Sequence, residues 1–523
     1  MIPLLRVCRQ WRCSALGDPS LWTTIYLSSV TPPLLDTILT HTGKRLLKIH
    51  IDCPEIGRRP RARLQKVVDR IEELDCWVGT DKIFSFLSSL GPVPNLKAFR
   101  LRNEVDGVAA DNGWEQLPVI FQDDGLASLP ELSLTTTVIW PFGLFRGIRS
   151  FELGAGPRAH FSPTHFLDVL RESPLVEDVR LVGTCLLSME GPPTVALQSL
   201  KNCTLIRNGA INLVWYLDIP PTASVFLSTP PRTDGDGTEL YPFRDLCFAP
   251  DLQVLDQVSV ASISIGFDAV RLRAQNDSGG TLTLQVYYHE NTMTGLIALS
   301  NLIQAAFSGR VCVFTTTKTF EYHIERGASR DDAEAVFNVS ILSRFTDGTP
   351  GLQQMKLDGV PAKVLSLHLK CLHNAPPTVV PFPDLQRLYI ESTPLRSPKS
   401  LLEDLSVLLK KRKDLGAPLQ FVNVKVHCER LITMTEHSAF LAAWEGLVGG
   451  DVEVEYSRDT VQKLPRRGKR ICYFNSEDES EDEEAGEAAE TAETDGESDV
   501  EWESWISGEW PKAVSEMREQ TEA

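Results

Sequence analysis

The chain has 523 residues, 42% of them apolar, which is enough to bury a large core and excludes a wholly disordered protein. Residues 476–523 contain 19 acidic and two basic side chains and account for almost all of the net charge of −18, so the nearly neutral remainder argues against nucleic acid as the main ligand. No apolar run reaches the roughly 18 residues of a membrane span. Residues 1–12 lack a signal-peptide pattern, and the eleven cysteines contain no C-x-x-C motif, so we expect a cytoplasmic or nuclear protein without a membrane partner.

The first 27 residues predict a short helical segment that docks on the next part of the chain. One face of its helix carries the apolar residues Leu4, Leu5, Cys8 and Trp11. The helix should end before Gly17, and residues 19–22 (PSLW) predict a short apolar hook.

This segment resembles the C-terminal half of the F-box-like module at the head of many fungal F-box proteins. The matching residues are Val7, Cys8, Arg9, Trp11, Arg12, Ala15, Pro19, Leu21 and Trp22. The resemblance implies binding to a Skp-type adaptor of a cullin ubiquitin ligase, with adaptor contacts from Leu4, Leu5, Val7 and Trp11. The alternative is that these four residues pack inside the module. The family's leucine–proline first helix is missing, which implies either a lost upstream exon or a loss of adaptor binding.

A hexad with the pattern apolar-x-x-apolar-x-apolar recurs along the chain. Copies begin at Leu46, Leu96, Leu129, Ile148, Val176, Leu352, Leu385 and Leu419. The last two apolar positions of each copy alternate, so they should face the same side of a short strand, while the first closes the preceding turn. A further match at Val364 begins only 12 residues after Leu352, and both cannot be consecutive repeats.

Helical patterns lie between the hexads. Ser or Thr followed by Pro marks helix starts at residues 31–32, 162–163 and 397–398, and residues 80–91 predict a helix that ends at Gly91. Alternating strands and helices at irregular spacings predict an α/β fold, a divergent leucine-rich-repeat solenoid over residues 28–457. This is also the usual continuation of the F-box-like family.

Residues 260–345 are the irregular part of this predicted solenoid. Leu282, Leu284 and Val286 alternate as in a strand, residues 294–307 predict a helix, and residues 311–313 and 339–341 predict two more strands. Larger repeats and an α/β insertion both fit this pattern. The last folded elements should be a helix around residues 440–444 and a strand at 452–456.

The C-terminal residues divide by charge into a basic linker at 458–475 and a disordered acidic tail at 476–523. The linker carries Lys463, Arg466, Arg467, Lys469 and Arg470. These residues fit either a nuclear-import or anion-binding patch or an ordinary solvated linker. In the tail, Ser476, Ser480, Thr494 and Ser498 each have an acidic residue three positions later, a context that acid-directed kinases favour.

Three short motifs suggest chemistry but lack the required context. His368-x-x-Cys371-x-His373 has no fourth zinc ligand nearby, and we expect it at the end of a strand over residues 364–370. Gly154-x-Gly156-x-x-Ala159 is followed too late by a helix to cradle a dinucleotide, and the loop at Asp234 lacks the acidic residue that completes a calcium site. We therefore expect no metal and no cofactor.

The sequence contains no G-x-S-x-G elbow, H-E-x-x-H helix or Walker loop. We expect a non-catalytic interaction protein that recruits an unidentified protein target to a cullin-type ubiquitin ligase. The first alternative is a leucine-rich-repeat binding protein without a link to ubiquitin. The second is an enzyme with its site in residues 260–345.

Overall fold

The computed structural model places its described residues in one compact unit, Met1–Thr460. The structure describes residues 14, 17–52, 57–77, 82–102, 129–135, 147–154, 160–161, 163–185, 193–206, 208–229, 252–266, 269–287, 316–324, 349, 351–360, 365–366, 369, 380, 382–392, 399–427 and 433–457. Among these residues, no helix is both long enough and apolar enough to cross a bilayer.

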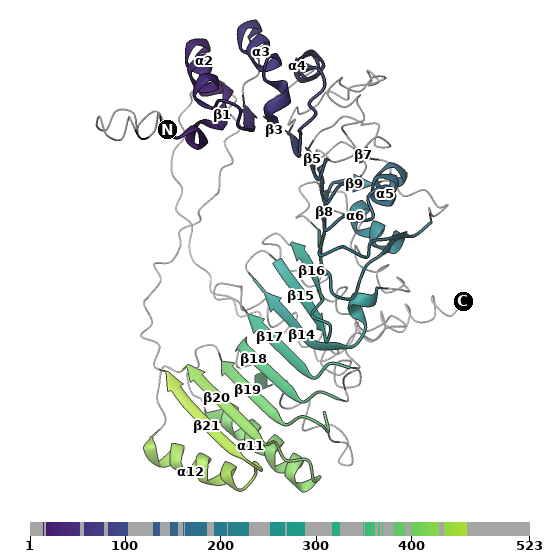
Figure 1. The fold of residues 1–523 in the computed structure, drawn as a ribbon. Helices are drawn as coiled ribbons and strands as arrows, with labels where there is room; N and C mark the ends of the chain where they lie inside the picture. The colour runs from purple at the N-terminus through teal and green to yellow at the C-terminus, as the bar shows by residue number, and fades with distance from the viewer. Residues whose placement is uncertain are drawn as a thin grey trace, which may run out of the picture. The chain divides into compact units, whose positions relative to one another are not determined.

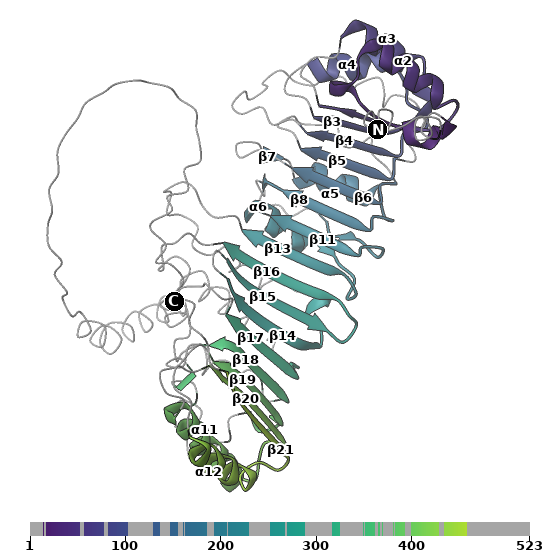
Figure 2. The same cartoon turned by 90° about the vertical axis from the view of Figure 1, so that its left-hand side faces the viewer.

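The structure is built around one 17-stranded sheet (Figures 1 and 2). In spatial order its strands are β1 (Thr24–Tyr26), β2 (Leu47–Ile51), β3 (Ile71–Trp77), β4 (Ala98–Arg102), β5 (Glu131–Thr135), β6 (Ser150–Gly154), β8 (Asp178–Val182), β11 (Asn202–Ile206), β13 (Ser224–Thr229), β16 (Thr281–Tyr287), β15 (Ala269–Asn276), β14 (Val258–Ile265), β17 (Thr319–Ile324), β18 (Gln354–Val360), β19 (Arg387–Ser392), β20 (Phe421–His427) and β21 (Asp451–Ser457). Two small sheets pair β7 (His160–Phe161) with β9 (Thr184–Cys185) and β10 (Val195–Ala196) with β12 (Leu217–Asp218).

Short helices connect the strands. The α-helices are α2 (Pro32–His41), α3 (Arg58–Gln65), α4 (Lys82–Leu90), α5 (Pro163–Arg171), α6 (Asn208–Ile211), α11 (Lys399–Asp414) and α12 (Met434–Glu445). Single 3₁₀ turns are η2 (Pro19–Trp22), η3 (Leu27–Ser29), η4 (Val68–Arg70), η8 (Asn212–Tyr216) and η10 (Gln253–Leu255). The predicted α/β class is thus confirmed as a mixed fold with a large, mostly parallel sheet and few helices.

Two rows of buried apolar side chains run across the sheet in register. One row comprises Ile25, Ile49, Leu74, Phe99, Leu132, Phe151, Val179, Cys203, Val225, Leu282, Ala274, Ala261, Phe320, Met355, Leu388 and Val422. The other comprises Ile51, Cys76, Leu101, Leu134, Leu153, Leu181, Leu205, Leu227, Leu284, Leu272, Ile263, Tyr322, Leu357, Ile390 and Val424. Each strand therefore covers the apolar side chains of the strand before it, and the two buried rows run continuously through the sheet.

The hexads predict these rows correctly. In all eight copies the last two apolar positions lie in the two rows, and the first position is buried in every copy except Leu46, which is 37% exposed. The strand predicted over residues 364–370 is wrong, because Leu365, Ser366 and Leu369 are helical. A hexad match alone does not distinguish a strand from an apolar helical face.

Helix starts and ends follow the expected local signals where the structure describes them. Thr31 precedes α2, Pro163 is the first residue of α5, and Gly91 follows α4 with a φ of 76°, a left-handed conformation that favours glycine. Helix α12 and strand β21 match the predicted last elements, and α12 packs against β21 and α11 (Figure 1). Buried helix residues belong to the same hydrophobic core as the strand rows, so the helices cover that face of the sheet.

The irregular region contains a reversal of strand order. Strand β16, not β14, pairs with β13, and β14 pairs with β17; both pairings are parallel. Between them, β15 runs antiparallel to β14 and to β16. The strand expected from Leu282, Leu284 and Val286 is confirmed as β16. Larger repeats and an α/β insertion both stay predictions for the region as a whole. The elements predicted at residues 294–307, 311–313 and 339–341 lie outside the described residues.

Candidate interaction surface

The strand residues that alternate with the two buried rows form the opposite surface of the sheet, which we call the outer face. On β2, for example, Lys48 and His50 lie between the buried residues Leu47, Ile49 and Ile51. Because neighbouring strands are in register, the outer-face side chains of successive strands also form rows. Polar and charged side chains predominate there.

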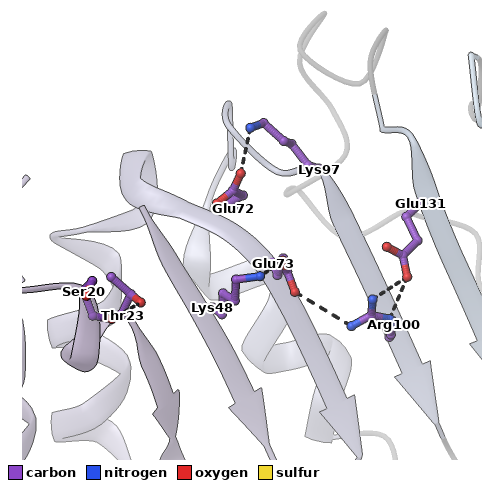
Figure 3. Close-up of polar contacts among 8 residues, drawn as sticks. All are labelled: Ser20, Thr23, Lys48, Glu72, Glu73, Lys97, Arg100 and Glu131. Atoms are coloured by element: carbon purple, nitrogen blue, oxygen red, sulfur yellow. Dashed lines mark hydrogen bonds and ion pairs between the residues drawn. The ribbon is translucent and has the colours of Figure 1, made fainter. Parts of the chain in front are cut away.

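A ladder of charges crosses the outer face from β2 to β5 (Figure 3). The Lys48 ammonium donates to Glu73 on the next strand, and this hydrogen bond raises the pKa of Lys48 above its ordinary value. Arg100 lies between two carboxylates: its Nη1 is 3.9 Å from Oε2 of Glu73, and its Nε donates to Oε1 of Glu131 over 2.8 Å. Opposite charges on adjacent strands attract each other, so each charged side chain restricts the conformations of its partner on the next strand.

Aromatic side chains flank this ladder. The Tyr26 ring stacks on the His50 ring with centroids 4.6 Å apart and an interplanar angle of 12°, and Nδ1 of His50 is 3.3 Å from Oδ2 of Asp75. Trp77, at the end of β3, is 55% exposed, and Tyr26 is 51% exposed. Large exposed aromatic side chains beside fixed charges are typical of the residues that dominate protein–protein binding energy.

Further along the sheet, outer-face charges are also paired. The contacts join Ser133 with Glu152, Glu152 with Arg180, His323 with Asp358, and Glu391 with both Lys425 and His427. A second set of pairs lies at the start of the strands, where Lys97 bonds Glu72 over 2.7 Å and Lys201 bonds Glu177. The hydrogen bond from Lys201 holds the pKa of Glu177 below its usual range.

The described part of the N-terminal segment is anchored to helix α2. Asp18 accepts a hydrogen bond from the Ser20 amide over 2.9 Å, and the Thr23 hydroxyl donates to the Ser20 carbonyl, which closes the η2 turn (Figure 3). Trp22 is buried and stacks on His41 at the end of α2, with ring centroids 5.1 Å apart. Leu21, by contrast, is 44% exposed. The predicted apolar hook is therefore a turn with one buried and one exposed apolar side chain.

Comparison of the sequence with protein-family models and with curated proteins gave no match. The surface must therefore be interpreted from its own chemistry. Among the described residues, no group of His, Cys, Asp and Glu side chains is arranged to hold a metal ion.

Most residues singled out by the sequence lie outside the described part of the chain. These are the adaptor candidates Leu4, Leu5, Val7 and Trp11, the phosphorylation candidates Ser476, Ser480, Thr494 and Ser498, the basic linker, the loop at Asp234, and His368, Cys371 and His373. Gly154 is described, and it ends strand β6 beside the Thr135 side chain. Helix α5 begins only at Pro163, which agrees with the late helix start expected there.

Sequence reasoning missed Tyr26, Trp77 and Arg100. The hexads that locate the strands also identify which residues alternate with the buried positions, so this signal was present for Arg100 between Phe99 and Leu101. The strands of the other two residues were not predicted. Cys76 takes the place of a large apolar residue on the Trp77 strand, and the Tyr26 strand has only three residues and no hexad.

Proposed function

We propose that this protein is a non-catalytic interaction protein, built as a divergent leucine-rich-repeat solenoid behind an F-box-like segment. In this role residues 1–27 bind a Skp-type adaptor of a cullin ubiquitin ligase, and the outer face binds the protein that is to be modified. The sheet acts as a scaffold, and burial of apolar and aromatic surface supplies the binding energy.

The observation that carries the binding role is the outer face over β1–β4. There Tyr26 and Trp77 are each more than half exposed, while the adjacent Lys48, Glu73 and Arg100 are held by one another. A partner that covers this area buries two large aromatic rings without having to order the charged side chains between them. Pre-ordering lowers the entropic cost of association.

The adaptor role is supported by the resemblance of residues 7–22 to the F-box-like module and by the docking of Trp22 on His41. Docking fixes the segment against the first repeat, so that an adaptor bound to residues 1–27 would be held at a defined place relative to the sheet. Leu21 remains exposed for such a contact.

Co-purification tests the adaptor role. The full chain, the Trp11→Ala variant and the Trp77→Ala variant are each co-expressed with a tagged Skp adaptor. We expect the full chain and the Trp77→Ala variant to co-purify with the adaptor. The Trp11→Ala variant should no longer co-purify with it. Failure of the unsubstituted chain to bind would instead favour the second candidate, a leucine-rich-repeat binding protein without a ubiquitin link.

A photo-crosslinking amino acid tests the target surface. It is introduced at Trp77 on the outer face and, as a control, at Leu175, which is 58% exposed and lies before β8. Repeated recovery of the same protein from Trp77 and not from Leu175 supports a target site over β1–β4. The same crosslinks from both positions would contradict it.

A further inference from the structure

Strand β21 lies at the end of the large sheet (Figure 1). Among the described residues it pairs with β20 alone, so one edge of β21 has no neighbouring strand. On the paired side, the Asp451 amide donates to the Gln420 carbonyl just before β20 over 3.1 Å. Both backbone polar groups of a strand residue point to one edge, and successive residues alternate between the edges. The N–H and C=O groups of Val452 and Val454 therefore point to the open edge.

The two buried rows end incompletely at β21. Val422 and Val424 of β20 are fully buried, whereas their partners in register on β21, Val452 and Val454, are only partly buried. At the other end of the sheet, Ile25 of β1 is 1% exposed. The apolar rows are thus closed at β1 and open at β21, and an added strand would bury the two valines further.

The outer face of β21 is acidic. Asp451, Glu453 and Glu455 alternate with the partly buried side chains, and all three are exposed. In the part of the chain that the structure describes, none of the three forms an ion pair. Lys425 of β20 is in register with Glu455, but its Nζ lies 3.5 Å from Glu391 on the far side of β20. The open edge therefore carries a row of negative charge.

These carboxylates decide which kind of strand can pair with the edge. Two copies of this chain joined antiparallel through β21 would bring both acidic rows to the same face, where like charges on adjacent strands repel. A segment with Lys or Arg at every second position places opposite charges there instead. Its intervening side chains lie on the helix-covered face, beside Val452 and Val454. The edge therefore favours basic and apolar residues in alternation.

We propose that the open edge of β21 binds an extended segment of a partner protein in which basic and apolar residues alternate. The segment adds one strand to the sheet, and its backbone pairs with Val452 and Val454. Its apolar side chains extend the two buried rows, and its basic side chains form charge-assisted contacts with the acidic row. This site lies at the opposite end of the sheet from the aromatic surface on β1–β4, and it depends on neither the adaptor proposal nor the target proposal.

Fluorescence anisotropy on the full chain, at about 0.15 M salt to screen the acidic tail, tests this site. The probe is a labelled nine-residue peptide of alternating Lys and Val. Two matched peptides carry N-methyl groups on all valines or on all lysines. In an added strand, every second amide faces β21 and the others face solvent, so only one of the two methylated peptides is blocked. The blocked one is the valine-methylated peptide for an antiparallel strand and the lysine-methylated peptide for a parallel strand.

We expect the unmethylated peptide to bind. The blocked peptide should bind about tenfold more weakly or worse, because it loses backbone hydrogen bonds, while the other methylated peptide should keep its affinity. The double variant Glu453→Gln/Glu455→Gln should weaken binding about threefold to tenfold. Glutamine keeps an oxygen that can accept the hydrogen bond of 2.6 Å that Asn423 donates to Glu453, so the variant loses mainly charge. The matched control Glu483→Gln/Glu484→Gln removes the same charge from the acidic tail and should weaken binding less than about twofold.

Several outcomes would overturn the proposal. Equal binding of all three peptides, or equal weakening by both double variants, would mean that the peptide is attracted to net charge alone. The absence of binding by the unsubstituted chain would mean that the edge does not accept such a segment. A dimer of the chain that excess peptide dissociates would assign the edge to a second copy.

A further variant tests the chain's own basic linker as the occupant. All five of the basic residues named for the linker are replaced by glutamine. A general gain in net negative charge would strengthen the binding of all three peptides alike, and this outcome leaves the edge to the partner segment. Tighter binding of the unmethylated peptide with unchanged binding of the blocked peptide would instead assign the edge to the linker and overturn the proposal.

Discussion

The Asn276 side chain donates a hydrogen bond of 2.7 Å from Nδ2 to the carbonyl oxygen of Pro221. Asn276 ends the reversed strand β15, and Pro221 lies just before β13, 55 residues earlier. The same amide group donates to the Val254 carbonyl and accepts from the Gly280 amide. One buried side chain therefore joins the meander to the parallel strand on which it packs.

Replacement of Asn276 by alanine should destabilise the protein by about 2–4 kcal/mol, because it removes three hydrogen bonds and leaves buried backbone groups without partners. Chemical denaturation of the variant measures this loss. The control is Asn202→Ala, which removes an exposed hydrogen bond to Asp178 and should cost less than about 1 kcal/mol. Equal costs for the two variants would mean that the asparagine does not hold the meander in place.

The buried rows predict a strong dependence of stability on side-chain volume. Leu134, in the second row, is fully buried between Leu101 and Leu153, so Leu134→Ala should cost about 2–5 kcal/mol through lost burial and a residual cavity. Leu175→Ala removes the same atoms from a side chain that is 58% exposed and should change stability by less than about 0.5 kcal/mol. Denaturation midpoints of the two variants provide the comparison, and a small effect of Leu134→Ala would contradict continuous packing along the row.

The eight hexads predicted strands whose two row positions are large apolar residues. The sequence missed β13 and β17, although Val225, Leu227, Phe320 and Tyr322 are equally large, because their first hexad position is a threonine. It also missed β3, β11 and β14, although each follows the hexad spacing, because a small side chain fills one row position. These positions are Cys76, Cys203 and Ala261, all fully buried. Cysteine and alanine fit these positions because they are small and apolar. They are too common in the rest of the sequence to identify a strand before its pairing with neighbouring strands is known.

The order of strands β14, β15 and β16 could not be read from the sequence. Alternating apolar residues define a strand and its two faces, but they say nothing about which strand lies next to it. The decisive contacts are specific: Asn276 with Pro221, and Gly280, where a Cβ would stand 1.9 Å from the Pro221 carbonyl oxygen.

The cysteine in the first buried row should be chemically inert in the folded protein. Burial raises the pKa of Cys203 from 9.0 to about 12, which lowers the thiolate fraction at pH 8 about a thousandfold. Alkylation at pH 8 followed by peptide mass analysis should leave Cys203 unmodified until denaturant is added. The control is a cysteine introduced by Asn202→Cys at the exposed neighbouring position, which should react at once; rapid native-state labelling of Cys203 would contradict its burial.

The start of α12 should make the stability of this helix depend on pH. Thr433 and Glu436 form a capping box, in which the Thr433 amide donates to Oε2 of Glu436 over 3.0 Å and the Glu436 amide donates to the Thr433 hydroxyl over 3.2 Å. The hydrogen bond from the Thr433 backbone, and then that from its hydroxyl, lower the pKa of Glu436 below 4.5. A lowered pKa in the folded state means that the charged carboxylate adds stability above pH 4.5, and that this contribution is lost as the pH falls through the folded-state pKa.

Melting temperatures of the unsubstituted chain and of Glu436→Gln between pH 3 and pH 7 test this dependence. The unsubstituted chain should be the more stable of the two at pH 7, and the difference should shrink as the pH falls through the folded-state pKa of Glu436, because protonation removes the charge that the substitution also removes. Glu445→Gln removes the same charge from the last turn of α12, where a carboxylate faces the helix carbonyl groups, so it should not lower the melting temperature at pH 7. A difference for Glu436→Gln that stays constant with pH would show that the charge of Glu436 contributes nothing and that the cap acts through its neutral hydrogen bonds.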